Sequence, residues 1–435
     1  MGRSNASAAA LVSAMNPDGA SPAIVTDQEA LVLVSFAHQL VHAMCAVELD
    51  RKLNGFSTTG RVIVAVWSYQ TAHHQQNSTT RALFESIIRA YPFAELLFFS
   101  LKERKGPLSP YRRIMQRSLW LRQRLGSIRI AHPDFFYAHD ASADHTAQAF
   151  MQALQETRNI CYGDAPGFLY PGLRPPRQSL TLSLSSLKNM LWQSRMSQVH
   201  DWYSATHAYA AVDFNEREKD QALPELTPIP PDLLIQHITQ LREVLPAIAD
   251  FEHVVLAKQR RPSTVLLLSN FSKSRLMSQR NEVLLYQRIC NENITPGARI
   301  LIKKHPGTTQ CFMTSLLRSL DNFQVEVFPQ HLEDLPIELF TEISTHTLVL
   351  SVSSASALFS LMPESKVIHA LKQKHICKLF YPTQQNYMLA ANNKILIHAC
   401  QWPLILTHFW PIELTHLLTA NRRFSASNDS SHLPA

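Results

Sequence analysis

Short apolar runs alternate with amphipathic segments along the first third of the chain. In the amphipathic segments apolar residues recur every three to four positions, as on one face of a helix, whereas continuous runs are typical of buried strands. The predicted strands are residues 31–34, 62–67, 95–99, 135–138 and 159–162, and the predicted helices are residues 37–49, 80–90 and 146–156. This alternation predicts a parallel sheet covered by helices.

The same rhythm returns in the C-terminal half. Its predicted strands are residues 265–268, 299–303, 324–328, 347–350 and 366–369, and its predicted helices are residues 281–290, 311–320, 335–341 and 355–361. Residues 173–261 between the two units are less regular, with a proline-rich loop predicted at 223–231 and a helix at 233–248. The chain is therefore predicted to be an α/β protein of two facing Rossmann-like domains with a cleft between them.

These patterns suggest four regions. Residues 1–27 are predicted to be a disordered leader without a signal-peptide pattern, 28–257 an N-terminal acceptor-side domain, 258–400 a nucleotide-binding domain, and 401–435 a C-terminal helix and polar tail. The six cysteines have no paired spacing, which indicates reduced thiols and a cytoplasmic location.

The net charge of +7 is concentrated in one segment. Between Lys102 and Arg129 there are nine basic residues and one acid, and the basic residues include Lys105, Arg112, Arg113 and Arg117. Such a patch attracts anionic lipid, an acidic polysaccharide or nucleic acid, but a solvated helical face explains it equally well. Base-stacking aromatics are sparse there, which argues against a nucleic-acid partner.

His305 and Pro306 follow a predicted strand of the C-terminal unit. Proline holds the preceding residue extended, so His305 is predicted to present its side chain at the end of the strand, where open α/β sheets bind ligands. Beyond Gly172 the chain has only Gly297 and Gly307. A glycine-rich phosphate loop is therefore excluded from this half, and a phosphate there would be held by hydroxyls, imidazole and backbone amides.

Ser353 and Ser354 follow another strand of this unit and open a short predicted helix. One serine is explained as a helix cap. Several hydroxyls at one strand-to-helix turn are better explained by an anionic ligand, since free amides and the helix dipole favour a phosphate.

Asp164 follows the last predicted strand of the N-terminal unit, between Gly163 and Ala165. A carboxylate at that place is a candidate general base, but an Asx-turn that bonds only local amides explains it equally well. Asp140 and Asp144 on the preceding loop are rival carboxylates.

The order of these motifs resembles the bacterial alpha-2,8-polysialyltransferase family, within the bacterial sialyltransferases of GT-B architecture. The family has an acid-and-glycine turn, a His-Pro and a Ser-Ser or Ser-Thr pair, in the order shown here by Gly163-Asp164, His305-Pro306 and Ser353-Ser354. The resemblance covers roughly residues 30–400, and one departure is Ala165, where the family often has glycine.

The resemblance implies a role for each motif. Asp164 would be the general base, and His305 with Pro306 would meet the phosphate of a CMP-sugar and protonate it as it leaves. Ser353 and Ser354 would bind the same phosphate, and Glu338 would hold the cytidine ribose. The implied activity is inverting transfer of sialic acid from CMP-sialic acid to a glycan or glycolipid acceptor, in capsule or lipopolysaccharide synthesis.

The sequence adds limits to that activity and leaves alternatives open. No Asp-x-Asp motif or zinc spacing occurs, so we predict a metal-independent reaction without a cofactor. Peripheral association with the inner membrane through the basic segment is a further expectation. The alternatives are another CMP-linked donor, such as Kdo or another nonulosonic acid, and a catalytically degenerate glycan-binding relative.

Overall fold

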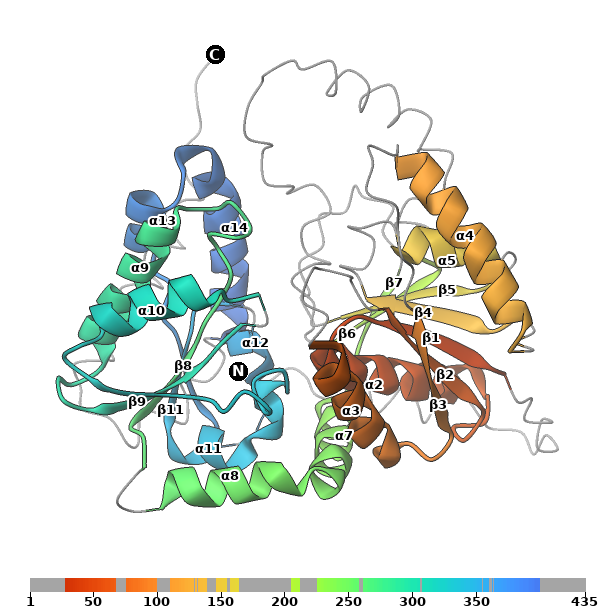
Figure 1. The fold of residues 1–435 in the computed structure, drawn as a ribbon, viewed down its shortest axis with the longest axis horizontal. Helices are drawn as coiled ribbons and strands as arrows, with labels where there is room; N and C mark the ends of the chain where they lie inside the picture. Colours follow the sequence, from red (N-terminus) through yellow and green to blue (C-terminus); the bar gives the residue numbers. More distant parts are fainter. Residues whose placement is uncertain are drawn as a thin grey trace, which may run out of the picture.

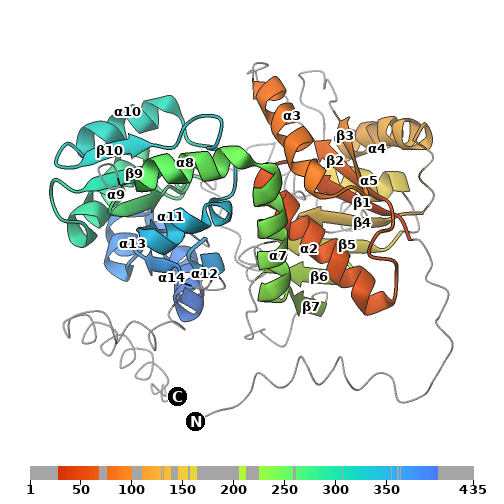
Figure 2. The ribbon, with the colours of Figure 1, turned by 90° about the horizontal axis from the view of Figure 1, so that it is seen from below.

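The structure is a computed structural model with two parallel sheets, which confirms the predicted α/β class with two Rossmann-like domains. It describes residues 28–67, 76–99, 110–128, 130, 132–138, 146–154, 157–163, 205–211, 225–257, 261–305, 307–353, 355–359, 362 and 364–399. Figures 1 and 2 show the two domains side by side, joined by the helices α7 and α8. The predicted leader 1–27 and tail 401–435 lie outside the described residues, and the predicted domain limits and cleft stay predictions.

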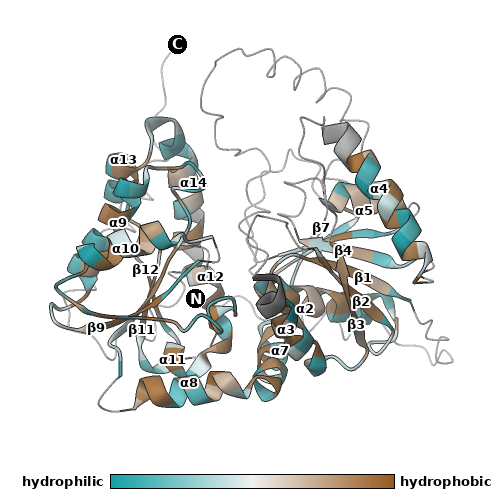
Figure 3. Ribbon diagram, in the orientation of Figure 1, coloured by the Kyte–Doolittle hydropathy of each residue, from teal (hydrophilic) through white to brown (hydrophobic). Residues whose placement is uncertain are grey.

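The N-terminal sheet has the strand order β3-β2-β1-β4-β5-β6-β7, and every pairing within it is parallel. Its strands are β1 (Ala30–Val34), β2 (Val62–Trp67), β3 (Ala94–Phe99), β4 (Asp134–Ala138), β5 (Asn159–Gly163), β6 (His207–Ala210) and β7 (Glu225–Pro228). Its helices are α2 (Ala37–Asn54), α3 (Gln76–Ile87) with the 3-10 turn η1 (Ile88–Ala90), α4 (Pro110–Gly126) and α5 (Thr146–Leu154). The central strands β1 and β2 are buried throughout and hydrophobic along their length (Figure 3).

Two predictions in this half are wrong. The stretch 223–231, predicted as a loop, contains β7, which pairs with β6. Proline is compatible with this position because Pro228 ends a strand at the described edge of the sheet, where no ladder hydrogen bond is lost. The single helix predicted at 233–248 is two helices, α7 (Pro231–Val244) and α8 (Pro246–Leu256). Pro246 has no N–H and forces Leu245 out of the helical conformation.

The C-terminal sheet has the order β10-β9-β8-β11-β12 and is also parallel. Its strands are β8 (Thr264–Leu267), β9 (Arg299–Lys303), β10 (Gln324–Val327), β11 (Leu348–Ser351) and β12 (Lys366–His369). Its helices are α9 (Gln279–Asn293), α10 (Gln310–Ser319), α11 (Thr341–His346), α12 (Ala355–Phe359), α13 (Gln373–Leu379) and α14 (Pro382–Ala399), and the 3-10 turn η5 (Ile337–Leu339) precedes α11.

Alternate residues of the C-terminal strands enter two different cores. Val265 and Leu301 join the large core that continues into the N-terminal domain, whereas Leu266 and Ile302 pack with α9, α10 and α13 on the other face. This division follows from the two-residue period of a strand. The C-terminal sheet is therefore covered on both faces, which leaves its edges as the places where polar side chains can meet a ligand.

Helix α8 ties the two domains together. Phe251 packs against Phe328 and Phe340, with ring centroids 5.0 Å and 6.0 Å apart. Arg242 of α7 pairs with the buried Glu252 of α8 at 2.9 Å and donates to the Leu339 carbonyl at 2.5 Å. Glu252 also accepts the backbone N–H of Glu342 at the start of α11. The helix pair is thus fixed to the C-terminal domain by packing and by charge.

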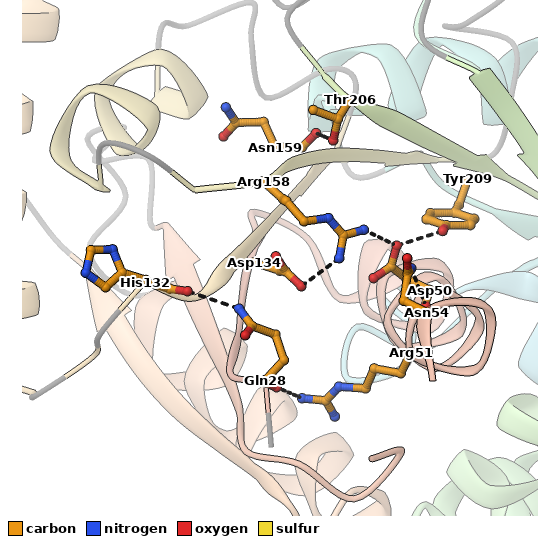
Figure 4. Close-up of polar contacts among 10 residues, drawn as sticks. All are labelled: Gln28, Asp50, Arg51, Asn54, His132, Asp134, Arg158, Asn159, Thr206 and Tyr209. Carbon is orange, nitrogen blue, oxygen red and sulfur yellow. Dashed lines mark hydrogen bonds and ion pairs between the residues drawn. The ribbon is translucent and has the colours of Figure 1, made fainter. Parts of the chain in front are cut away.

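A polar cluster lies where the N-terminal strands begin, at the edge opposite their carboxyl ends (Figure 4). Arg158 donates to Asp134 at 3.0 Å and to Asp50 at 2.8 Å, and the Tyr209 hydroxyl donates to the same Asp50 oxygen at 2.8 Å. Arg51 donates to several main-chain carbonyls, including Gln28 and Gly60. These contacts join α2 to β6 and to the starts of β1, β4 and β5, so the cluster supports the fold.

Candidate functional site

The predicted site residues lie at the carboxyl edge of the C-terminal sheet. His305 stands two residues beyond the end of β9, and Ser353 stands two residues beyond the end of β11. In the sheet order β8 lies between these strands. With neighbouring strands about 4.8 Å apart, the two strand ends are separated by roughly 10 Å. Side chains from both strands can therefore reach one ligand placed over the end of β8.

The imidazole of His305 is held in one tautomer. The backbone N–H of Gly307 donates to Nδ1 at 3.0 Å, so in the neutral ring the proton is on Nε2. Partial desolvation and then the positive charges of Lys273 and Lys303 lower the pKa of His305 to about 4, although the residue exposes much of its surface. At neutral pH the ring is therefore uncharged and offers an Nε2–H donor, a suitable contact for an anionic oxygen.

The serine turn after β11 is organised largely by its own hydrogen bonds. The Ser351 hydroxyl accepts the backbone N–H of Ser353 at 3.2 Å, so this amide is already used. The helix that follows, α12, has only five residues. A helix dipole therefore contributes little to the site. The half-buried Ser353 hydroxyl, rather than the N-terminus of the helix, is the group of this turn that can donate to a phosphate. Ser354 lies outside the described residues.

Behind this turn lies a chain of buried polar groups. The Ser356 hydroxyl oxygen lies 2.6 Å from the Ser353 carbonyl and 2.7 Å from Nδ1 of His369, and Nε2 of His369 lies 2.8 Å from Oδ1 of Asn392. Because Oδ1 of Asn392 can only accept, the neutral ring of His369 carries its proton on Nε2 and donates it to Asn392, which leaves Nδ1 as an acceptor facing the Ser356 hydroxyl. Burial lowers the pKa of His369 to about 4. These hydrogen bonds, made by side chains of α12, β12 and α14, hold the Ser353 carbonyl in place.

Glu338 lies on η5, near the same edge, and is 9% exposed. Its negative charge acts on Lys303, whose ammonium donates to the Glu333 carbonyl at 2.6 Å and lies 5.4 Å from the Phe328 ring centroid. Burial lowers the pKa of Lys303 to about 8, against the opposing charges of Glu338, Asp334 and Glu333. A buried carboxylate at this place can accept hydrogen bonds from ribose hydroxyls, which is the role the sequence predicts for it.

Several predicted site residues cannot be placed. Asp164, Pro306 and Lys105 lie outside the described residues, as do the rival carboxylates Asp140 and Asp144. Arg112 and Arg113 lie on α4, and only their backbone is described. The structure therefore describes His305, Ser353 and Glu338 from the donor half of the predicted site, and both halves of the site stay predictions.

Arg117 is not on an exposed basic face, so its assignment to the surface patch is wrong. The residue is 6% exposed, donates to the Thr146 hydroxyl at 3.0 Å, and lies over the Trp67 ring at 5.3 Å. The reason is its place on α4: Ile114, Leu121 and Leu125 are buried at helical spacing with it. That spacing was visible in the sequence and would have placed Arg117 on the inward face.

Asn270 and Lys273, in the loop after β8, were not predicted as site residues. A Cβ atom built on Gly307 would lie 2.5 Å from Nδ2 of Asn270 and 3.2 Å from Nζ of Lys273. Both side chains therefore lie directly over Gly307, next to His305. The topological order could have drawn attention to this loop, since β8 is the central strand between the two motif-bearing strands.

Two features of the described residues bear on the predicted metal independence and membrane association. Within the described ranges there is no group of three or more His, Cys, Asp or Glu side chains arranged to hold a metal ion, and metal independence stays a prediction. Across those same ranges, none of the helices has the length and apolar character needed to cross a membrane.

Comparisons with known proteins give only distant likenesses. No protein-family model matches the chain, and no curated protein matches it. Among solved structures, UDP-GlcNAc 2-epimerase from Neisseria meningitidis is 14% identical with a TM-score of 0.47, covering 84% of this chain and 94% of that one. MurG from Acinetobacter baumannii is 10% identical with a TM-score of 0.33, covering 91% and 99%. An alpha,alpha-trehalose-phosphate synthase (UDP-forming) from Burkholderia vietnamiensis is 10% identical with a TM-score of 0.36, covering 87% and 97%. At these scores the likenesses carry no argument, and the architecture rests on the two sheets themselves.

Proposed function

We propose that this chain is an inverting, metal-independent sialyltransferase or polysialyltransferase of GT-B architecture that uses CMP-sialic acid as donor. The observation that carries the proposal is the set of groups at one sheet edge: the Nε2–H of His305, the hydroxyl of Ser353 and the buried carboxylate of Glu338. An uncharged imidazole and a hydroxyl suit a single phosphate, and a carboxylate suits the hydroxyls of a ribose.

The proposed reaction needs a base for the proton of the acceptor hydroxyl and hydrogen-bond donors for the leaving phosphate. The acceptor hydroxyl oxygen attacks the anomeric carbon from the face opposite the phosphate, and its proton passes to Asp164. The bond between the anomeric carbon and the phosphate oxygen breaks, and CMP leaves with the electron pair. Inversion follows from the opposite-face attack. Hydrogen bonds from His305 and Ser353 stabilise the departing phosphate, at roughly 1.5–3 kcal/mol for each bond to a charged group.

The neutral form of His305 refines its role. With Nδ1 occupied by the Gly307 N–H, the free ring acts as a hydrogen-bond donor and is not a charged acid at neutral pH. A bound phosphate, being negative, raises the pKa of an adjacent imidazole. In this proposal His305 therefore becomes able to share a proton with the leaving group only when the donor is bound.

Transfer from CMP-sialic acid to glycan acceptors, followed by mass spectrometry in the presence of EDTA, tests the proposal. We expect sialylated product with the wild-type protein, and a loss of about 10²–10⁴-fold in rate for Asp164→Ala and a strong loss for His305→Ala. Product formed with CMP-Kdo instead of CMP-sialic acid would change the assigned donor and leave the assigned site unchanged. CMP-sugar binding without transfer to any acceptor would favour a degenerate glycan-binding relative.

The acceptor and the location of the protein belong to the same proposal. A surface glycan or glycolipid on the cytoplasmic side is the proposed acceptor, and the basic residues around Lys105, Arg112 and Arg113 are proposed to meet it or the inner-membrane surface. Co-sedimentation with anionic and neutral vesicles tests the membrane part. Equal amounts of protein sedimenting with anionic and with neutral vesicles would rule out the proposed contact with the membrane surface.

A further inference from the structure

The loop after β8 places two hydrogen-bond donors over the residue that follows the His305-Pro306 motif. Asn270 Nδ2 and Lys273 Nζ both lie within 3.2 Å of the point where Gly307 would carry a Cβ atom. Any larger residue at Gly307 would displace Asn270, since a contact of 2.5 Å is shorter than side chains tolerate. The missing side chain of Gly307 therefore leaves room for the close approach of Asn270 and Lys273.

These two groups are not engaged elsewhere in the described part of the chain. The side chains of Asn270 and Lys273 have no hydrogen-bond or ion-pair partner among the described residues, although the Asn270 backbone carbonyl accepts the Ser274 N–H. The neighbouring lysines differ: Lys304 pairs with Glu333, and Lys303 donates to the Glu333 carbonyl. Lys273 is therefore the cation at this edge whose charge is not already matched by an acid of the described chain.

The loop that carries these groups is anchored. The carboxylate of Glu282 on α9 accepts the backbone N–H groups of Phe271 and Ser272 at 3.0 Å and 2.9 Å, and the Tyr286 hydroxyl accepts that of Ser269 at 2.5 Å. Glu282 is almost fully buried. The backbone between Ser269 and Ser272 is fixed before any ligand arrives, which lowers the cost of binding.

We propose that Asn270 and Lys273, together with the Nε2–H of His305, form an anion-binding subsite that takes the phosphate of a nucleotide sugar. The sheet order supports this arrangement, because β8 lies between β9 and β11, so its loop begins between the strand ends that precede His305 and Ser353. Two atoms so close to one point can share one phosphate, whose oxygens accept hydrogen bonds at about 2.7–3.2 Å. The identity of the ligand as a nucleotide sugar rests on the proposed function, whereas the anion subsite does not.

A titration of His305 by NMR tests the subsite with inorganic phosphate as the probe. The ring signals are assigned with His305→Ala, and ionic strength is kept constant with sodium chloride. In the wild-type protein we expect phosphate to raise the pKa of His305, because a nearby anion favours the imidazolium. In Lys273→Met we expect a higher pKa of His305 without phosphate, since a positive charge is removed, and phosphate affinity weakened about tenfold or more.

Two further variants sharpen the test. Gly307→Ala moves the Asn270 amide and is expected to weaken the phosphate response. Lys366→Met removes an exposed lysine from the start of β12, at the opposite edge of the same sheet, and is expected to behave as the wild type. Lys273 is exposed, so circular dichroism should show an unchanged fold. Absence of any phosphate effect on His305 in the wild-type protein, or an equal effect in Lys273→Met, would overturn the subsite.

Calorimetry with CMP and cytidine separates this inference from the proposed function. We expect Lys273→Met to weaken CMP about tenfold or more and to leave cytidine unchanged. A phosphate effect on His305 without any CMP binding would keep the subsite and remove the CMP-sugar function. Equal CMP affinity in the wild type and Lys273→Met would keep the function and remove Lys273 from the subsite.

Discussion

Replacing Arg158 with methionine should destabilise the N-terminal domain strongly. The guanidinium bridges Asp134 and Asp50, at 3.0 Å and 2.8 Å, and the two carboxylates are 6% and 1% exposed. Methionine keeps much of the side-chain volume but removes the charge. Both carboxylates would then be buried without the cation that offsets their desolvation, and the Tyr209 hydroxyl would be left as a hydrogen-bond donor to Asp50.

The size of the effect follows from burial. Removing one partner of a buried pair typically costs about 3–5 kcal/mol. Arg158 itself is 30% exposed, so water already screens part of the interaction and the lower end of that range applies. We therefore expect a loss of about 3 kcal/mol in the free energy of unfolding at pH 8. Arg61→Met is the matched control, because its pairs with Glu29 and Glu95 are at the surface and should cost no more than about 1 kcal/mol.

The loss should depend on pH in a defined direction. Burial raises the pKa of Asp134 to about 6, against the lowering effect of Arg158. Ionised Asp134 therefore opposes folding, and the stability contributed by its protonated form is complete below its unfolded value of 3.8 and is lost as the pH rises through about 6. Without Arg158 this pKa rises further, so the variant should lose most above pH 6 and progressively less toward pH 5.

Urea denaturation followed by tryptophan fluorescence measures this. Trp67 and Trp120 pack against each other in the same domain, with ring centroids 6.4 Å apart, and report its unfolding. A loss below about 1 kcal/mol at pH 8, or a loss of the same size at pH 5 and pH 8, would show that Arg158 does not compensate the buried carboxylates.

Three further outcomes follow from the structure. His369→Phe should weaken CMP binding about tenfold by releasing the Ser353 turn, and cytidine affinity should be unchanged. His369→Gln should restore part of the lost affinity. His375→Phe, the control, replaces another buried histidine of the same domain and should leave CMP affinity unchanged. Arg242→Ala should cost about 3 kcal/mol in the unfolding free energy, because it leaves the buried Glu252 without its cation; a change in melting temperature no larger than that of Arg61→Met would contradict this. Glu338→Gln should weaken CMP and cytidine alike but leave the phosphate response of His305 unchanged, and a selective loss of the phosphate response would move Glu338 away from the ribose.

Most strands of the two sheets could be predicted from the sequence because they are continuous apolar runs. Val62–Trp67 and Arg299–Lys303 were predicted with the bounds that the structure shows. The strands β6 and β7 were missed because each has four residues, and the proline-rich stretch around Pro228 looks like a loop when pairing is unknown. A short edge strand is specified by its neighbour, so local pattern alone does not reveal it.

The site was predictable only where a motif marks a strand end. His305 and Ser353 follow their strands as predicted, but Asn270 and Lys273 were given no site role, and their place over Gly307 depends on tertiary packing. The same limit applies to Arg117, which charge counting assigned to the surface although helical spacing places it in the core. Charge alone does not tell which face of a helix a residue occupies.

Calorimetric titration of the protein with CMP and UDP, in EDTA, shows whether this sheet edge binds a cytidine nucleotide. We expect binding of CMP that is weakened about tenfold or more in His305→Ala, together with no comparable binding of UDP. Binding of UDP in preference to CMP, or CMP affinity that is unchanged in His305→Ala, would contradict the assignment of this sheet edge as a CMP-sugar site.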